Sequence, residues 1–111
     1  MIRGSVYPID LGDAKRGREQ RGKRYGIVLS EAPETWSTVF IVPTSTSAQD
    51  AIFRPLLHIN GRDTRALIDQ ARTIDVQYIV GDRVDHLSRT DLAQVEFALA
   101  RYLQLRLELD Y

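Results

Sequence analysis

Residues 17–30 read GREQRGKRYGIVLS, a basic segment punctuated by glycine that runs directly into an apolar stretch. The apolar part, residues 24–30, is short and rich in β-branched side chains, which is typical of a well-buried strand. The sequence TVFIV at residues 38–42 has the same character and follows after a turn. If these strands are antiparallel neighbours, the start of the first and the end of the second lie at one end of the sheet.

Shorter strands are expected on both sides of this pair. The first covers residues 4–9, where Pro8 indicates an edge or a strand end. Pro43 is expected to end the strand at 38–42, because it has no N–H to donate to a ladder. Further strands are expected at residues 53–59, 66–70 and 73–76, with a shorter strand or turn at 81–84. The pair Asn60-Gly61 predicts a tight turn between the first two of these.

One helix is predicted near the end of the chain. Ser88 is a good N-cap, and Asp91 stands three residues further on in a capping-box-like arrangement. Apolar side chains then recur at helical spacing, at Leu92, Val95, Leu99, Tyr102 and Leu103. The sequence therefore predicts a mainly β fold with one C-terminal helix, a compact barrel of short strands that forms a single domain over residues 1–111.

Composition limits the chemistry that this chain can perform. Hydrophobic residues make up 43% of its 111 residues, which is enough for a core. The chain has no cysteine, which excludes disulfides, thiolate catalysis and cysteine-bound zinc. No apolar run is long enough for a membrane span, and residues 1–4 lead into strand-like sequence without a signal peptide. We therefore expect a cytoplasmic protein that does not associate with membranes.

The charge distribution is more informative than the net charge, which is zero. Six basic residues lie between positions 15 and 24, against the single acid Glu19. A cluster of this kind can attract a polyanion even in a neutral chain. The alternative interpretation is an ordinary solvated loop.

Several enzyme classes find no support in the sequence. The two histidines, His58 and His86, are far apart and belong to no metal-ligand pattern, so no metal site and no cofactor are expected. There is no nucleophile elbow, phosphate-binding loop or dinucleotide fingerprint. The remaining candidates are arginine and hydroxyl groups. Arg24 opens its strand, and Thr44, Ser45 and Thr46 follow Pro43, so the expected pairing brings them to one rim.

An arginine beside hydroxyls can form a phosphate site, because the planar guanidinium binds two oxygens and the hydroxyls add donors. The alternative is that Arg24 forms a surface salt bridge and the hydroxyl segment is only a turn. The residues alone leave both interpretations open.

Four segments, in order along nearly the whole chain, resemble the MazF/PemK family of toxins. The most specific is residues 17–30, which resemble the family's glycine loop and second strand. Residues 3–7 resemble its opening strand, residues 39–45 its third strand and active-site turn, and residues 67–74 its Asp-Gln segment. The resemblance implies an SH3-like barrel, usually a homodimer, that acts as a toxin endoribonuclease and is blocked by a cognate antitoxin.

The resemblance also implies roles for particular residues. The family's catalytic arginine matches Arg24, and its catalytic threonine matches Ser45. This serine departs from the family's pattern, and its neighbours Thr44 and Thr46 are further candidates for the same role. The residue after the arginine is often proline in the family and is Tyr25 here. The implied reaction is attack of the ribose 2′-OH on the adjacent phosphate of single-stranded RNA, without a metal, with Arg24 stabilising the charge that develops. The residues expected to contact RNA are Glu19, Gln20, Arg21, Lys23, Thr44, Asp69 and Gln70.

Two other functions remain open at this point. The chain could be a non-catalytic barrel of the same shape that acts as a toxin by binding a protein such as gyrase. It could also be an RNA-binding module that does not cut, since a basic loop suits both RNA binding and cleavage.

Overall fold

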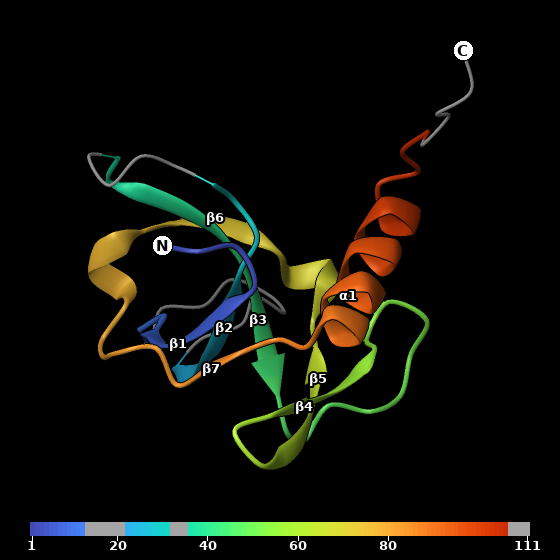
Figure 1. The fold of residues 1–111 in the computed structure, drawn as a ribbon, viewed down its shortest axis with the longest axis horizontal. Coiled ribbons are helices and arrows are strands. Elements are labelled where there is room, and N and C mark those ends of the chain that lie inside the picture. The colour runs from blue at the N-terminus through green and yellow to red at the C-terminus, as the bar shows by residue number, and fades with distance from the viewer. Residues whose placement is uncertain (13–21, 32–35, 107–111) are drawn as a thin grey trace.

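The computed structural model describes residues 1–12, 22–31 and 36–106. Figure 1 shows short strands that curve into a barrel-like sheet, with helix α1 (Arg89–Tyr102) toward the C-terminal side. The elements follow in the order β1 (Ser5–Asp10), β2 (Lys23–Val28), β3 (Thr38–Ser45), β4 (Leu56–Ile59), β5 (Arg62–Ala66), the 3-10 helix η1 (Ile68–Gln70), β6 (Arg72–Asp75), the 3-10 helix η2 (Val76–Tyr78), β7 (Asp85–His86) and α1 (Arg89–Tyr102).

The strands form one nearly closed antiparallel sheet in the order β4-β5-β3-β2-β1-β7. The expected antiparallel pairing of the two central strands is confirmed, with Gly26 opposite Pro43 and Val28 opposite Ile41. Strand β3 pairs with β6 along its first half and with β5 at its end. This change of partner bends the sheet into a barrel. The mainly β fold with one C-terminal helix is as predicted.

The central strands bury side chains on both faces, which explains why they read as continuous apolar runs rather than as alternating ones. Ile27 and Val42 belong to one core cluster, whereas their neighbours Val28 and Ile41 belong to a second cluster on the opposite face. All four side chains are buried. Each contributes about 1.5–3 kcal/mol through removal of apolar surface from water.

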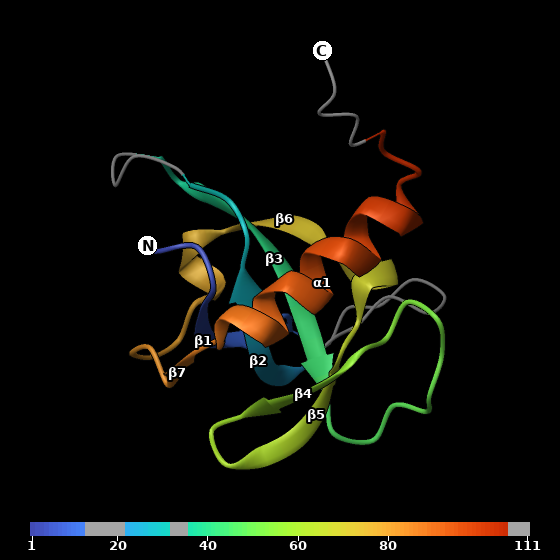
Figure 2. The same cartoon turned by 45° about the vertical axis from the view of Figure 1, so that its right-hand side comes forward.

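Helix α1 covers the first of these clusters. Val95 and Ala98 pack with the β2 and β3 side chains, and Figure 2 shows the helix lying across this face of the sheet. The N-cap prediction is confirmed, because the Ser88 side chain accepts a hydrogen bond from the Asp91 backbone N–H at 3.1 Å. An ion pair between Arg3 and Glu96 also joins the helix to the start of the chain.

Pro43 does not end its strand, which corrects the sequence prediction. It stands inside β3, between the residues that pair with β6 and those that pair with β5. Its carbonyl accepts the Leu67 N–H at 2.8 Å, while the Leu67 carbonyl accepts the Gln70 N–H instead of one from proline. The Leu67 carbonyl, which faces Pro43, therefore has a donor although proline has no N–H. Strand β3 continues through Thr44 and Ser45.

One further strand prediction is wrong in position. Of the segment 66–70, only Ala66 lies in a strand, as the last residue of β5 (Arg62–Ala66), and residues 68–70 form η1. The segment 81–84, predicted as a short strand or a turn, contains a bend at Gly81 and no strand residue. The two-residue strand β7 follows it and pairs with β1. Among the described residues, no helix combines the length and apolar character needed to cross a membrane.

Candidate functional site

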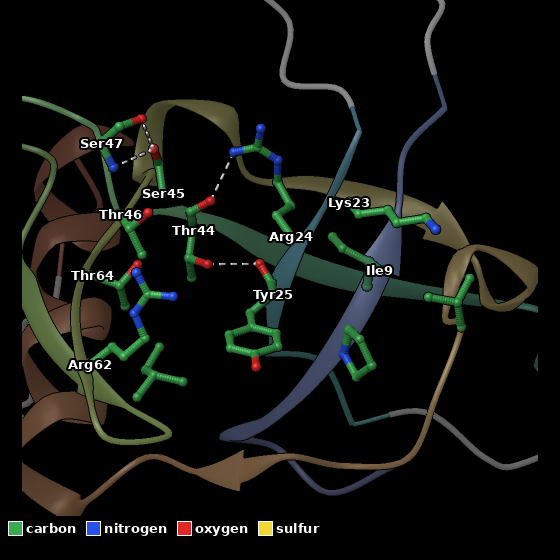
Figure 3. A pocket seen from close by; sticks show the side chains of 13 residues that line it. Ile9, Lys23, Arg24, Tyr25, Thr44, Ser45, Thr46, Ser47, Arg62 and Thr64 are labelled. Atoms are coloured by element: carbon green, nitrogen blue, oxygen red, sulfur yellow. Dashed lines mark hydrogen bonds between the residues drawn. The ribbon is translucent and has the colours of Figure 1, made fainter.

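A pocket of about 450 Å³ opens at the rim of the barrel, where β2 begins and β3 ends (Figure 3). Its walls come from four places: the β1–β2 pair, the end of β3 with the turn that follows, the β4–β5 hairpin, and Val80 in the segment after η2. The lining residues are Pro8, Ile9, Lys23, Arg24, Tyr25, Thr44, Ser45, Thr46, Ser47, Ile59, Arg62, Thr64 and Val80. The antiparallel pairing of β2 with β3 thus brings Arg24 and the hydroxyl segment 44–46 into one pocket, as expected from the sequence.

Arg24 is fixed to the neighbouring strand by its own side chain. Its Nη1 donates to the backbone carbonyl of Thr44 at 2.9 Å. Partial burial of the guanidinium lowers the pKa of Arg24 from its ordinary value, because desolvation disfavours the charged form. An arginine starts so far above neutral pH that the group remains a cation. The site therefore holds a partly desolvated positive charge beside several hydroxyl groups.

The three hydroxyls at 44–46 have different surroundings. Thr44 is only 3% exposed, and its Oγ1 donates to the Tyr25 backbone carbonyl at 3.0 Å. Ser45 lies at the end of β3, with its Oγ 3.2 Å from both the Ser47 N–H nitrogen and the Ser47 Oγ. Thr46 is exposed in the turn, and within the described residues its side chain has no hydrogen-bond partner.

The other residues predicted to contact RNA do not all lie at this pocket. Lys23 is exposed and lines the pocket next to Arg24. Glu19, Gln20 and Arg21 lie outside the described residues, as does most of the basic loop predicted from the sequence.

Asp69 and Gln70 lie in η1 and do not line this pocket. The Asp69 carboxylate is held by Arg54, whose Nε and Nη2 donate to its two oxygens at 3.1 and 2.8 Å. This pair lowers the pKa of Asp69, chiefly through the hydrogen bonds from Arg54. In this structure the Asp69 carboxylate therefore joins two parts of the chain.

Sequence reasoning missed the contribution of the β4–β5 hairpin. Arg62 and Thr64 from β5 line the pocket opposite Arg24, and Figure 3 shows the Arg62 side chain extending into it. The Asn60-Gly61 turn signal indicated the hairpin, and so a strand beginning at Arg62, but not that this strand would lie beside the pocket.

The histidines stand apart from this pocket. His58 lies 3.3 Å from Asp63 across the β4–β5 hairpin, and His86 contacts backbone carbonyls of Arg3 and Leu87. Within residues 1–12, 22–31 and 36–106, no group of three or more histidine, aspartate or glutamate side chains is placed to hold a metal ion.

Comparisons with known proteins identify a family by sequence and a matching fold by structure. Residues 2–103 match the family described as PemK-like, MazF-like toxins of type II toxin–antitoxin systems. Over 105 residues the chain is 58% identical to Rv3098A, a proposed toxin of Mycobacterium tuberculosis, covering 95% of this chain and 99% of that protein. The fold matches MazF from Deinococcus radiodurans with a TM-score of 0.81 at 23% identity, covering 92% of this chain and 94% of that one.

A second solved structure resembles the chain over almost its whole length. It is an endoribonuclease from a mycobacterial species in complex with its cognate antitoxin, with a TM-score of 0.77 at 19% identity. The match covers 97% of this chain and 99% of that one. At such identities the solved structures establish the fold, and the predicted SH3-like barrel of the MazF type is confirmed.

Proposed function

This chain belongs to the PemK-like, MazF-like toxin family of type II toxin–antitoxin systems, and from that membership we propose that it is an endoribonuclease that cuts single-stranded RNA at short sequence motifs. The observation that carries the proposal is the position of the Arg24 guanidinium in one pocket with the hydroxyls of Ser45 and Thr46. The fold alone supports several activities, whereas this pairing of a cation with small donors suits a phosphodiester.

The proposed reaction uses the substrate's own nucleophile. The ribose 2′ oxygen attacks the adjacent phosphorus, so that the O2′–P bond forms and the P–O5′ bond breaks. The 2′-OH gives up its proton, and the departing 5′ oxygen takes one, which leaves a 2′,3′-cyclic phosphate and a 5′-OH. Such a reaction requires neither a nucleophile from the protein nor a metal.

Arg24 has the central role in this proposal. Negative charge accumulates on the phosphate oxygens as the pentacoordinate transition state forms, and a fixed guanidinium stabilises that charge. Its hydrogen bond to the Thr44 carbonyl orients it before RNA arrives. Partial burial supports the role as well, because a charge interaction strengthens where water is excluded. Ser45 or Thr46 would then donate to a phosphate oxygen or to the leaving oxygen.

A cleavage assay in EDTA tests the proposal. We expect wild-type protein to cut a long single-stranded RNA without added metal. Arg24→Ala should lower the rate by about a hundred-fold or more, the usual effect of removing a group that stabilises transition-state charge. Arg24→Lys keeps the positive charge but loses the planar guanidinium that can bind two phosphate oxygens at once, so it should retain only part of the wild-type rate. Arg89→Ala, an exposed arginine at the start of α1 that does not line the pocket, is the matched control.

The same assay separates the alternatives that the sequence left open. Binding of RNA without cleavage would favour an RNA-binding module. Neither binding nor cleavage would favour a toxin with a protein target such as gyrase. The position of Arg24 beside hydroxyls favours the nuclease over both.

We further propose that a cognate antitoxin inhibits this chain by covering the RNA pocket, and that the active form is a homodimer. The first proposal is supported by the solved complex of a related endoribonuclease with its antitoxin. The second rests on the family. Addition of the cognate antitoxin should abolish cleavage, and light scattering should give twice the 12.7 kDa chain mass.

A further inference from the structure

We propose that the aromatic ring of Tyr25 is the floor of a nucleobase subsite, on which a base next to the scissile phosphate stacks. This inference rests on the proposed RNA function and adds to it a residue that determines where the strand is held. Tyr25 stands at the position where the family often has proline, so the subsite would be a property of this chain rather than of the whole family.

The pocket has a polar part and an apolar part. The polar part contains Arg24 and the hydroxyl groups described above. The apolar part is formed by Tyr25 together with Pro8, Ile59 and Val80. In Figure 3 the side chains of Arg24 and Tyr25 leave β2 in opposite directions, as successive strand residues do. Both side chains nevertheless line the same pocket, so a phosphate bound by Arg24 has an aromatic side chain one residue away along the same strand.

The Tyr25 ring is held at both ends. Its backbone is paired with Pro8 in the β1–β2 ladder. Its hydroxyl accepts a hydrogen bond at 3.1 Å from Nδ2 of Asn60, which lies in the turn of the β4–β5 hairpin. Asn60 and Gly61 both have positive φ, which is the geometry of a tight two-residue turn and gives the amide a defined position. A ring fixed in advance loses little conformational entropy when a ligand packs on it.

Burial leaves part of the ring available. Tyr25 is half-buried, because part of its side chain packs on the first core cluster while the rest lines the pocket. An aromatic ring that lines a pocket together with a phosphate-binding cation is a combination that binds single-stranded RNA, because stacking accepts any base. A planar nucleobase is thus the ligand that this half of the pocket fits.

Arg62 gives the subsite a positively charged wall. It lies two residues after Asn60 and extends from β5 into the pocket on the side that Tyr25 faces (Figure 3). Among the described residues its guanidinium has no ion-pair or hydrogen-bond partner. If a base stacks on the Tyr25 ring, the Arg62 guanidinium is placed to bind either the polar edge of that base or the phosphate of the same nucleotide.

The test uses RNA that cannot be cut, so that it does not depend on catalysis. Short oligoribonucleotides are fully 2′-O-methylated, carry one 2-aminopurine at each position in turn, and are degenerate elsewhere. Stacking on an aromatic ring quenches 2-aminopurine. We expect wild-type protein to quench the probe at one position in particular. Tyr25→Leu should abolish that quenching and weaken binding by about five-fold or more, the low end for one base–aromatic stack.

Two variants control for structure. Tyr25→Phe keeps the ring and loses the Asn60 hydrogen bond, so it should retain the quenching. Tyr78→Leu makes the same change at a part-exposed tyrosine outside the pocket lining and should have no effect. A thermal melt of each variant excludes loss of binding through unfolding. Should Tyr25→Leu itself unfold, Tyr25→Val and Tyr25→Met are measured in its place.

The outcomes separate this inference from the proposed nuclease function. Quenching that persists in a folded Tyr25→Leu protein, or no quenching by wild type at any position, overturns the subsite even if wild type cuts RNA. Quenching that requires the Tyr25 ring upholds the subsite even if natural RNA is bound but not cut.

Discussion

At the residue scale, the three hydroxyls of Thr44, Ser45 and Thr46 look equivalent in the sequence but have different surroundings in the structure. The Thr44 hydroxyl is buried and donates to the Tyr25 carbonyl, so its hydrogen bond joins β3 to β2 beneath Arg24. Ser45 and Thr46 lie further out, where a bound phosphate could reach them. The match to the family's threonine falls on Ser45, and the surroundings of these side chains favour the same position over Thr44.

We therefore predict that substitutions at Thr44 and Ser45 affect different measurements. Thr44→Val keeps the shape but leaves the Tyr25 carbonyl without its donor, so the unfolding free energy should fall by about 1 kcal/mol. Ser45→Ala should leave stability nearly unchanged and lower the cleavage rate by about ten-fold or more, through loss of a donor to the reacting phosphate. Urea denaturation and single-turnover cleavage measure the two effects.

Ser45→Thr is the matched control, since it restores a hydroxyl at the same position and should keep the rate near that of wild type. A Thr44→Val protein that is fully stable but inactive, beside an active Ser45→Ala protein, would transfer the role to Thr44. If only Thr46→Ala is inactive, the role belongs to Thr46.

At the element scale, the Arg54–Asp69 pair connects the segment before β4 to η1. Both nitrogens that bind Asp69 come from one guanidinium, which makes the contact bidentate. A second arginine extends this connection, because Arg65 Nη1 donates to the Arg54 carbonyl at 2.9 Å and contacts Asp50 at 3.1 Å. These contacts fix the chain between the hydroxyl turn and the β4–β5 hairpin, and so hold two walls of the pocket relative to each other.

This pair predicts a defined dependence of stability on pH. Since the pKa of Asp69 is lowered in the folded state, the unfolded chain binds more protons as the pH falls below the ordinary aspartate value of 3.8. The contribution of the pair is therefore complete above that value and is lost as the pH falls through the lower folded-state pKa. At neutral pH, Asp69→Asn should reduce the unfolding free energy by about 1 kcal/mol.

Denaturation curves of wild type and Asp69→Asn should converge as the solution is acidified from pH 6 toward pH 2. In a double-mutant cycle with Arg54→Gln, the second substitution should cost little once the first is made. Curves that stay parallel over this range would show that the carboxylate contributes nothing through its charge.

The success of sequence reasoning also varied by element. The β2–β3 pair and the α1 N-cap could be predicted, because an apolar β-branched run and a Ser88–Asp91 pattern are local signals. The prediction of a strand at 66–70 is wrong beyond Ala66, since Ala66, Leu67 and Ile68 are all buried and a short apolar run does not distinguish a strand end from a 3-10 turn. The partner of Asp69 could not be predicted, because Arg54 is fifteen residues away in the sequence.

At the scale of the whole molecule, net charge is a poor guide to the function of this chain. Its fifteen basic and fifteen acidic residues cancel, yet Lys23, Arg24 and Arg62 all line one pocket. The fold achieves this concentration by bringing β2 and the β4–β5 hairpin to the same rim. The sequence indicates the first two cations, which are adjacent. For the third, the Asn60-Gly61 signal indicates a strand that begins at Arg62, but the place of that strand beside the pocket depends on β3 separating from β6 and pairing with β5.

This local charge predicts how RNA binding responds to salt. Each phosphate neutralised on a single strand contributes a slope of about −0.7 to a plot of log affinity against log salt concentration. A neutral chain with a few pocket cations should therefore show a shallow slope rather than the steep one of a basic protein. If Arg62 binds one phosphate, Arg62→Gln should reduce the magnitude of the slope by about 0.7.

Arg89→Gln removes one charge from outside the pocket and is the matched control, so its slope should equal that of wild type. Binding is measured with uncut 2′-O-methylated RNA between 50 and 300 mM KCl, a range over which the slope is well defined. Because a phosphate contact positions the strand without reading its bases, Arg62→Gln should weaken all sequences alike. An unchanged slope with altered base preference would instead assign Arg62 to the edge of the base that stacks on Tyr25, since a hydrogen bond to a base releases no counterion.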